Sequence, residues 1–222
     1  MAETMTTDVA PEPGHHETHV PQPGEHGWTY TGLSNEKLAM WLFLGTECLL
    51  FGGLISTYLL YKSRVPDNHG PKPHELYDIP FTSVSSFVLL MSSLTMVLAV
   101  AAIARGDHRN TRVWLVTTAL LGSIFISGQV YEFTSFVKEG MGFTTNVASS
   151  AFFTLTGFHG VHVSVGIMML MALMFMLSRN KVAGDKAETV EMIGLYWHFV
   201  DIVWIIIFTV VYLIPTAPGG GS

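Results

Sequence analysis

The sequence predicts an all-α membrane protein, a bundle of five transmembrane helices. Only 13% of its 222 residues are charged and 49% are hydrophobic, whereas a typical soluble domain carries about 25% charged residues. The mean hydropathy is correspondingly high, at +0.41. Because a segment in lipid must satisfy its own backbone hydrogen bonds, each long apolar stretch is expected to be a helix.

Residues 1–37 are expected to form a disordered tail. The first 36 residues hold six acidic residues and neither Lys nor Arg, and Pro, Gly and His are frequent among them. Such a composition offers too little apolar surface for a folded core, and it lacks the apolar run of a signal peptide. Four histidines of this tail could chelate a metal, although a solvated tail is the simpler interpretation. They are His15, His16, His19 and His26.

Residues 38–214 are expected to form the transmembrane domain. Each span is long enough to cross a hydrocarbon core about 30 Å thick. In chain order the five spans cover residues 38–61, 81–104, 113–136, 147–178 and 192–214. Residues 215–222 form a short C-terminal tail, and its final GGGS is typical of an engineered linker.

The basic residues predict that the N-terminus lies inside and the C-terminus outside. With five spans, seven Lys and Arg residues share the side of the N-terminus and four share the side of the C-terminus. Loops rich in Lys and Arg are preferentially retained inside. Beyond the tail, eleven acidic residues balance eleven basic ones, so the body of the chain offers no basic surface for nucleic acid.

Small residues in the first and fourth spans predict close packing of helices. Glycine lets helix backbones approach one another within a membrane, and the single cysteine, Cys48, is expected to be a small packing residue. The glycines concerned are Gly45, Gly52, Gly53, Gly157, Gly160 and Gly166.

Glu47 is the one charged residue of the first span. It lies nine residues into that span, about 14 Å deep at 1.5 Å per residue. A carboxyl group there is either active in proton transfer or a neutral acid that is hydrogen-bonded to a neighbour. The second role, structural or in contact with lipid, is favoured because no other acid marks a relay at that depth.

His159 and His162 are three residues apart and therefore share one face of the fourth span. Ligation of haem or another metal would require further ligands from facing helices, and His198 is the only other histidine within a span. Hydrogen bonding to a neighbouring helix or a lipid head group is the favoured interpretation. Since the depths match, we expect Glu47 to contact His159 or His162.

Two further polar pairs have the same spacing of three residues. Gln129 and Glu132 lie near the outer end of the third span, where they are expected to reach the interface. His198 and Asp201 are expected to pair with each other just below the inner surface. The neighbouring Tyr196 and Trp197 would then belong to an interfacial aromatic belt; such belts are common at membrane surfaces. No phosphate-binding loop, HExxH, CxxC or dinucleotide-binding turn is present in the sequence.

Four segments, each in a different span, carry a more specific pattern. In chain order they read LGTECLLFGG (44–53), GQVYEF (128–133), TGFHGVHVSVG (156–166) and LYWHFVDIVWIIIFTVVYLI (195–214). Together they resemble subunit III of the haem–copper terminal oxidases, the cytochrome c oxidase subunit 3 family, over residues 38–214. In this resemblance Glu47 matches the intramembrane glutamate of the family.

The resemblance implies a non-catalytic subunit in the inner membrane of a bacterium, with no active site and no metal of its own. Haem and copper would lie in the partner catalytic subunits. The chain would pack mainly on oxidase subunit I and bind phospholipid. It would support proton uptake and stable turnover while electrons pass from cytochrome c to dioxygen. The residues expected to serve lipid contact or buried polar packing are Glu47, Gln129, Glu132, His159, His162, His198 and Asp201.

Many members of this family have seven helices, whereas this sequence has five spans. The lipid cleft of the seven-helix form lies between its first two helices and the other five. Another chain, or helices added to subunit I, would have to complete such a cleft here. Two alternatives stay open: an accessory subunit of a quinol oxidase or nitric oxide reductase, and an electron-transfer protein with a b-type haem on His159, His162 or His198.

Overall fold

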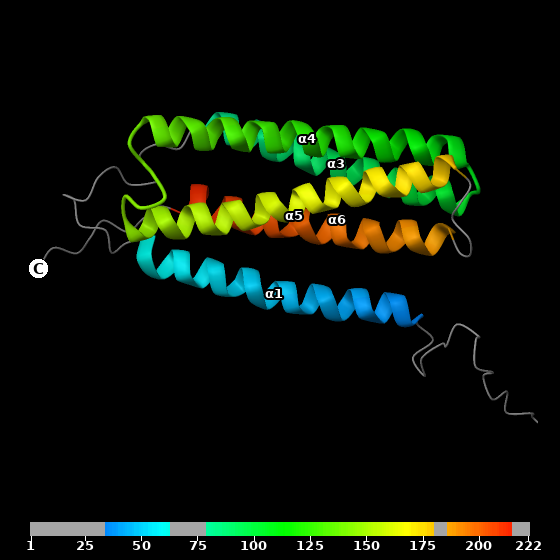
Figure 1. The fold of residues 1–222 in the computed structure, drawn as a ribbon, viewed down its shortest axis with the longest axis horizontal. Helices are drawn as coiled ribbons and strands as arrows, with labels where there is room; N and C mark the ends of the chain where they lie inside the picture. Colours follow the sequence, from blue (N-terminus) through cyan, green and yellow to red (C-terminus); the bar gives the residue numbers. More distant parts are fainter. Residues whose placement is uncertain (1–33, 63–78, 180–185, 215–222) are drawn as a thin grey trace, which may run out of the picture. The chain divides into compact units, whose positions relative to one another are not determined.

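The structure, a computed structural model, describes residues 34–62, 79–179 and 186–214, most of which are helical (Figure 1). The helices are α1 (Asn35–Lys62), α3 (Ile79–Ala104), α4 (His108–Lys138), α5 (Val147–Ser178), α6 (Lys186–Phe208) and a closing π-helical turn, η1 (Thr209–Leu213). Within these ranges, five helices are long and apolar enough to cross a membrane. The predicted all-α class with five candidate spans is therefore confirmed.

Most of the observed helices begin earlier than the predicted spans. α4 begins at His108 and α6 at Lys186, because polar and capping residues continue a helix beyond its apolar stretch. α5 has the predicted limits. The tails expected over residues 1–37 and 215–222, including the four tail histidines, lie outside the described residues except for residues 34–37.

The chain divides into two units, residues 1–38 and residues 39–222. The described part of the first unit is the start of α1. There the Ser34 hydroxyl accepts a hydrogen bond from the Lys37 backbone N–H at 3.3 Å. A serine in this position caps the helix by satisfying a backbone donor that has no partner within the helix.

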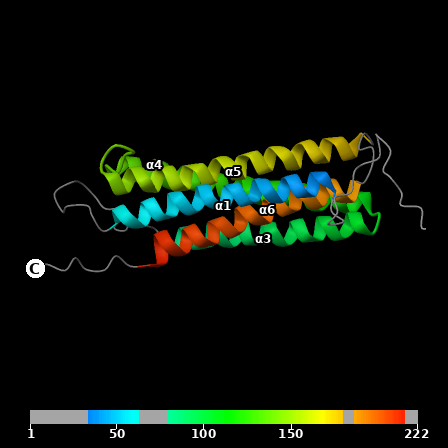
Figure 2. The ribbon, with the colours of Figure 1, turned by 90° about the horizontal axis from the view of Figure 1, so that it is seen from below.

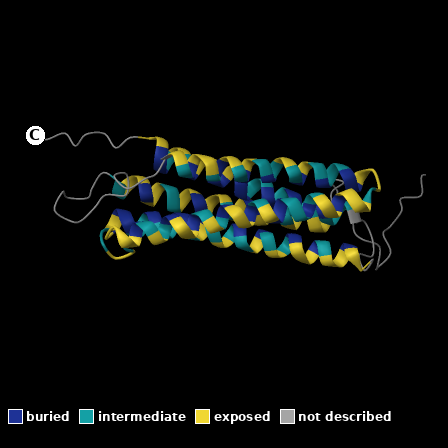
Figure 3. Cartoon of the chain, turned by 90° about the horizontal axis from the view of Figure 1, so that it is seen from above, coloured by how far each residue is buried: buried dark blue, intermediate teal, exposed yellow. Residues whose placement is uncertain are grey.

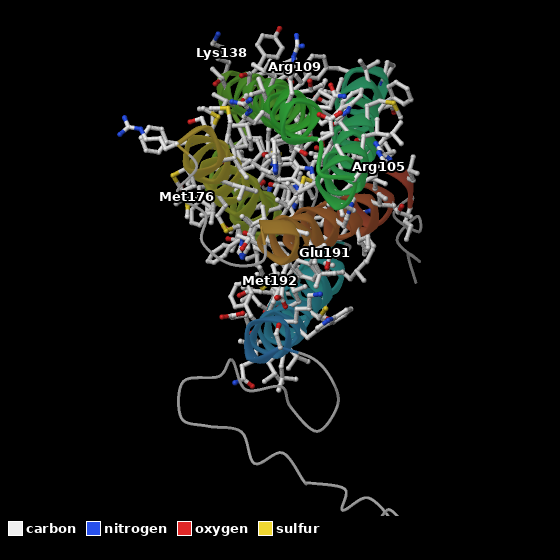
Figure 4. All side chains as sticks on the ribbon, turned by 90° about the vertical axis from the view of Figure 1, so that its right-hand side faces the viewer. Arg105, Arg109, Lys138, Met176, Glu191 and Met192 are labelled. Atoms are coloured by element: carbon white, nitrogen blue, oxygen red, sulfur yellow. The ribbon has the colours of Figure 1, made fainter. Side chains whose placement is uncertain are left out.

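In the second unit, α3, α4, α5 and α6 form a closed ring of four packed helices. α3 packs against α4 and α6, and α5 packs against the same two helices; Figure 4 looks along this ring. α1 lies beside α5 and α6 (Figure 2). Its buried side chains are Leu44, Phe51 and Tyr58. Figure 3 shows exposed residues along the outer faces of the helices, as expected for a bundle surrounded by lipid.

Two glycines turn the chain at the ends of α3 and α4. Gly106 has φ +75° and Gly140 has φ +90°, a left-handed conformation that glycine adopts without steric cost. After Gly106, Asp107 caps α4 by accepting a hydrogen bond from the Asn110 backbone N–H at 3.1 Å. The short connection through Gly106 makes α3 and α4 antiparallel neighbours, and the turn at Gly140 leads from α4 to α5.

Glycines allow Trp197 of α6 to enter the centre of the ring. A Cβ atom placed on Gly166 would lie 2.9 Å from the indole, and one on Gly122 would lie 2.6 Å from it. The packing role predicted for Gly166 is thus confirmed, and Gly160 similarly approaches the Gln129 side chain.

The glycines of α1 do not fit that prediction. Gly45, Gly52 and Gly53 meet nothing within 4 Å, and neither does Gly157. Cys48, expected to be a packing residue, is exposed. Contact between α1 and its neighbours depends on large side chains such as Phe51 instead, so this helix packs without close approach of backbones.

Lys62, at the end of α1, is bonded to the end of the last helix. Its ammonium group donates to the carbonyl oxygens of Val210, Val211 and Ile214 at 3.0, 3.3 and 2.6 Å. Carbonyl groups at the end of a helix lack partners within that helix and attract cations. Lys62 therefore joins the first and last helices at one end of the bundle.

Candidate functional site

The first polar site joins α1 to α5. The Glu47 Oε2 atom lies 3.1 Å from His162 Nε2, and each side chain is 15% exposed. Both residues are near the middle of their helices, and Phe51 packs edge-on against the imidazole. The expected contact of Glu47 is thus confirmed for His162, and not for His159.

The hydrogen bonds of His162 determine how many protons this pair holds. Its Nδ1 atom lies 2.7 Å from the Phe158 carbonyl oxygen, which can only accept, so Nδ1 carries a proton. A hydrogen bond from Nε2 to Glu47 then needs one more proton. Either a neutral carboxyl donates to Nε2, or a protonated imidazole donates to the carboxylate. In both cases the pair is neutral overall, and this suits its position inside a span.

His159 occupies a fully buried aromatic site. Its imidazole stacks on Trp204 with ring centroids 4.8 Å apart, and Phe125 meets it edge-on at 5.9 Å. Neither imidazole nitrogen has a hydrogen-bond partner among the residues that the structure describes. His159 and His162 are close in sequence, yet one is held among aromatic rings and the other bonds a carboxyl group.

The second polar site lies between α3 and α6. Ser93 Oγ of α3 lies 2.6 Å from His198 Nδ1 of α6. Among the described residues His198 bonds Ser93 and not Asp201, so the predicted direct pairing of His198 with Asp201 is wrong.

The predicted position of Asp201 near the inner surface is also wrong. Since α6 begins at Lys186, Asp201 lies well inside the helix, where it is 5% exposed. Its Oδ1 atom has no hydrogen-bond partner in the described parts of the chain. Tyr196 and Trp197 are not an interfacial belt, because both are buried. The Tyr196 hydroxyl donates to the His162 carbonyl oxygen at 3.0 Å, and the indole of Trp197 donates to Ser92 Oγ at 3.0 Å.

The third polar site surrounds Glu132 of α4. Its Oε1 atom accepts hydrogen bonds from Thr82 of α3 at 2.7 Å and from Tyr212 of η1 at 3.2 Å. Gln129, one turn earlier, donates to the Thr156 carbonyl oxygen of α5 at 3.0 Å. Both Gln129 and Glu132 are buried, so the expectation that they reach the interface is wrong.

Sequence reasoning missed the hydroxyl groups of α3. Ser86 accepts from the Trp204 indole at 2.8 Å, as Ser92 does from Trp197, while Thr82 and Ser93 serve Glu132 and His198. The signal that could have found them was a set of small hydroxyl residues along one otherwise apolar span. Through these hydroxyl groups, α3 forms hydrogen bonds with polar side chains of both α4 and α6.

Among the described residues, no group of three or more His, Cys, Asp or Glu side chains is placed to hold a metal ion. Each histidine within the helices has a separate environment. His159 packs on aromatic rings, His162 bonds Glu47, and His198 bonds Ser93. The sites therefore consist of polar contacts between neighbouring helices, within a multi-pass membrane protein.

Comparison with known proteins assigns these helices to a family. The sequence profile described as "Cytochrome c oxidase subunit III" matches residues 22–215, and the chain belongs to this family. It is accordingly subunit 3 of a haem–copper oxidase, whose complex contains other oxidase subunits.

The similar proteins are named either as cytochrome c oxidase subunits or as quinol oxidase subunits. Cytochrome c oxidase subunit 3 of Bacillus sp. strain PS3 is 40% identical over 87% of this chain and 92% of the relative. Quinol oxidase subunit 3 of Bacillus subtilis strain 168 is 37% identical over 79% of this chain and 85% of the relative. Cytochrome bo(3) ubiquinol oxidase subunit 3 of Pseudomonas aeruginosa PAO1 is 34% identical, with 85% and 90% covered.

Proposed function

We propose that this chain is a non-catalytic subunit that packs on oxidase subunit I, binds phospholipid, and supports proton uptake and stable turnover. The observation that carries the proposal is the use of polar side chains inside the spans. Glu132 accepts hydrogen bonds from two other helical elements, and Gln129 donates to a fourth helix. Such contacts hold helices together. Haem and copper would then be held by the partner catalytic subunits.

The contact between Glu47 and His162 has a supporting role in this proposal. The pair holds its proton between two helices and is only 15% exposed on each side. Its carboxyl and imidazole groups would face lipid head groups or the catalytic subunit without binding a redox centre. The remaining polar residues, His159, His198 and Asp201, would serve packing.

Cytochrome c is the proposed electron donor of the complex, and quinol is the second candidate. The family description and the relative from Bacillus sp. strain PS3 favour cytochrome c, whereas the relatives from B. subtilis and P. aeruginosa favour quinol. Oxygen consumption by the purified complex with reduced cytochrome c, and separately with a quinol, decides between them. An accessory subunit of a nitric oxide reductase would instead co-purify with a catalytic subunit that reduces nitric oxide.

The proposed orientation places the N-terminus inside and the C-terminus outside. It rests on the excess of Lys and Arg in the segments on the N-terminal side. Cysteines introduced at Asn110 and Glu139, at opposite ends of α4, would be labelled from opposite sides of sealed vesicles. Labelling of Asn110→Cys from outside would show that the orientation is the opposite of the proposed one.

Co-purification in mild detergent tests the accessory role. We expect the chain to bring the catalytic subunit with it and to show no Soret absorption when it is purified alone. A Soret band from the isolated chain would support the alternative, a b-type haem protein. Turnover by the isolated chain would also contradict an accessory role.

A further inference from the structure

A surface groove of about 480 Å³ lies between α4 and α5 at the end of the bundle where α4 begins. Arg109 and Arg112, from the first turns of α4, stand at one end of this groove. Its walls include Val113 and Val116 of α4 and Met174 of α5. The groove therefore combines two cations with an apolar wall at one end of the spans.

The groove is lined by two positive charges and by no negative charge. Its lining contains no Asp or Glu, and the first turn of α4 has no acidic residue. The N-terminus of a helix carries partial positive charge, so two arginines there repel both the helix and each other. Asp107 is near, but its carboxylate oxygens accept hydrogen bonds from the backbone and side-chain N–H groups of Asn110.

Both arginines are exposed, and Figure 4 shows Arg109 on the outer side of α4. Arg112 uses its Nε–H group to donate to the His108 carbonyl oxygen at 3.2 Å. That bond holds the side chain near the backbone, while its terminal N–H groups keep the forked geometry that suits phosphate oxygens. Within the described parts of the chain, no carboxylate pairs with either arginine.

We propose that this groove binds an anionic phospholipid of the bilayer. Its phosphate would bind between Arg109 and Arg112, and one acyl chain would lie along Val113, Val116 and Met174. Basic residues at the membrane surface attract anionic lipid by about 1 kcal/mol each, and an apolar wall below them suits an acyl chain. This site deepens the phospholipid binding of the proposed function and rests on it, although the groove shares no residue with the Glu47 and His162 pair.

Native mass spectrometry of the oxidase complex tests the site. The complex, delipidated in mild detergent, is titrated with phosphatidylglycerol, and the bound lipids are counted. The double variant Arg109→Gln/Arg112→Gln should lose one high-affinity lipid, with its affinity reduced roughly tenfold or more. Lys138→Gln is the matched control, because it removes one exposed cation from the opposite end of the same helix and should retain that lipid.

A second variant tests whether the groove binds a lipid and not only a small anion. Val116→Trp fills the apolar wall and leaves both arginines in place, so it should also reduce phosphatidylglycerol binding while the haem content of the complex stays normal. Unchanged lipid affinity in the double variant, or an equal loss in Lys138→Gln, would overturn the proposal. A structure of the complex with a partner subunit seated in the groove would overturn it as well.

Discussion

Glu47 of α1 contacts His162 of α5, with a distance of 3.1 Å between Oε2 and Nε2. The Phe158 carbonyl oxygen fixes the other imidazole nitrogen as a donor, so a hydrogen bond between Nε2 and Oε2 needs at least one further proton on the pair. A glutamine in place of Glu47 can donate from its amide to the unprotonated Nε2 atom. The hydrogen bond does not therefore require an acid.

Glu47→Gln is expected to leave the complex assembled and to change turnover only modestly. Haem content and oxygen consumption of the purified variant are the measurements. Glu47→Leu is the matched comparison; it leaves Nε2 without a partner and should destabilise α1 by about 1–2 kcal/mol. Complete loss of oxygen reduction in Glu47→Gln, with normal haem content, would show that the carboxyl group takes an essential part in proton transfer.

Glu132→Leu is expected to lower the thermal stability of the complex. The substitution removes the hydrogen bonds that the Thr82 and Tyr212 hydroxyls donate to Glu132, at a cost of roughly 0.5–1.5 kcal/mol for each bond. Glu132→Gln keeps an acceptor oxygen and should lose much less. The control is Glu139→Gln, which changes an exposed acid just after the same helix. Equal stability of all three variants would remove the structural role of Glu132.

Gly166→Ala is expected to destabilise the bundle by about 1–3 kcal/mol, because the added methyl would lie 2.9 Å from the Trp197 indole. Gly157→Ala is the matched control on the same helix. Its methyl meets nothing within 4 Å, and removal of a glycine from a helix is favourable by roughly 0.5–1 kcal/mol. In thermal unfolding in detergent, the midpoint of Gly166→Ala should fall and that of Gly157→Ala should rise. Indistinguishable midpoints would contradict this packing.

Asp107 should make the start of α4 sensitive to acid. The Asn110 backbone N–H, together with the Asn110 side chain, lowers the pKa of the Asp107 carboxyl below its usual value. A depressed pKa in the folded state means that the cap stabilises α4 above the unfolded pKa of about 3.9. That stabilisation is lost as the pH falls through the lower, folded pKa.

Hydrogen exchange of the α4 N-terminus, compared with Asp107→Asn at each pH, measures this effect. The asparagine oxygen still accepts the cap hydrogen bond but does not titrate, so the variant should lose less protection than the wild-type chain on acidification. Parallel loss of protection in both proteins would show that the cap does not depend on the Asp107 charge.

Removal of phospholipid by detergent is expected to shorten the working lifetime of the complex. The proposed function assigns lipid binding to this subunit, and added phospholipid should restore the lifetime. The measurement is the decay of oxygen consumption during continuous turnover, with bound lipid phosphorus determined in parallel. Unchanged inactivation after verified removal of lipid would contradict the supporting role.

The helices were predictable because long apolar stretches leave few other structures possible in lipid. The contact of Glu47 with α5 was also predictable, since a constant rise per residue gives the depth of a side chain once its helix is placed. The choice of His162 over His159 was not, because the two residues share a face and only the rotation of α5 against α1 and α6 separates them.

Other parts of the site could not be predicted from the sequence. The depth of Asp201 depended on the start of α6, which lies within a polar segment that hydropathy does not detect. Trp197 and Tyr196 resemble interfacial residues in sequence, and only the glycines facing them reveal that they are buried. Ser93 is uncharged and lies beside Ser92, so no pattern showed which of the two would meet His198.

The ammonium group of Lys62 has consequences for biogenesis. Its acceptors, from Val210 to Ile214, are synthesised about 150 residues later, and domains emerge from the ribosome N-terminal part first. These hydrogen bonds of Lys62 can therefore form only after η1 has been made, whereas Glu47 and Phe51 can contact α5 earlier. A chain truncated before Val210 would lack the acceptors of Lys62 and leave this end of α1 without them.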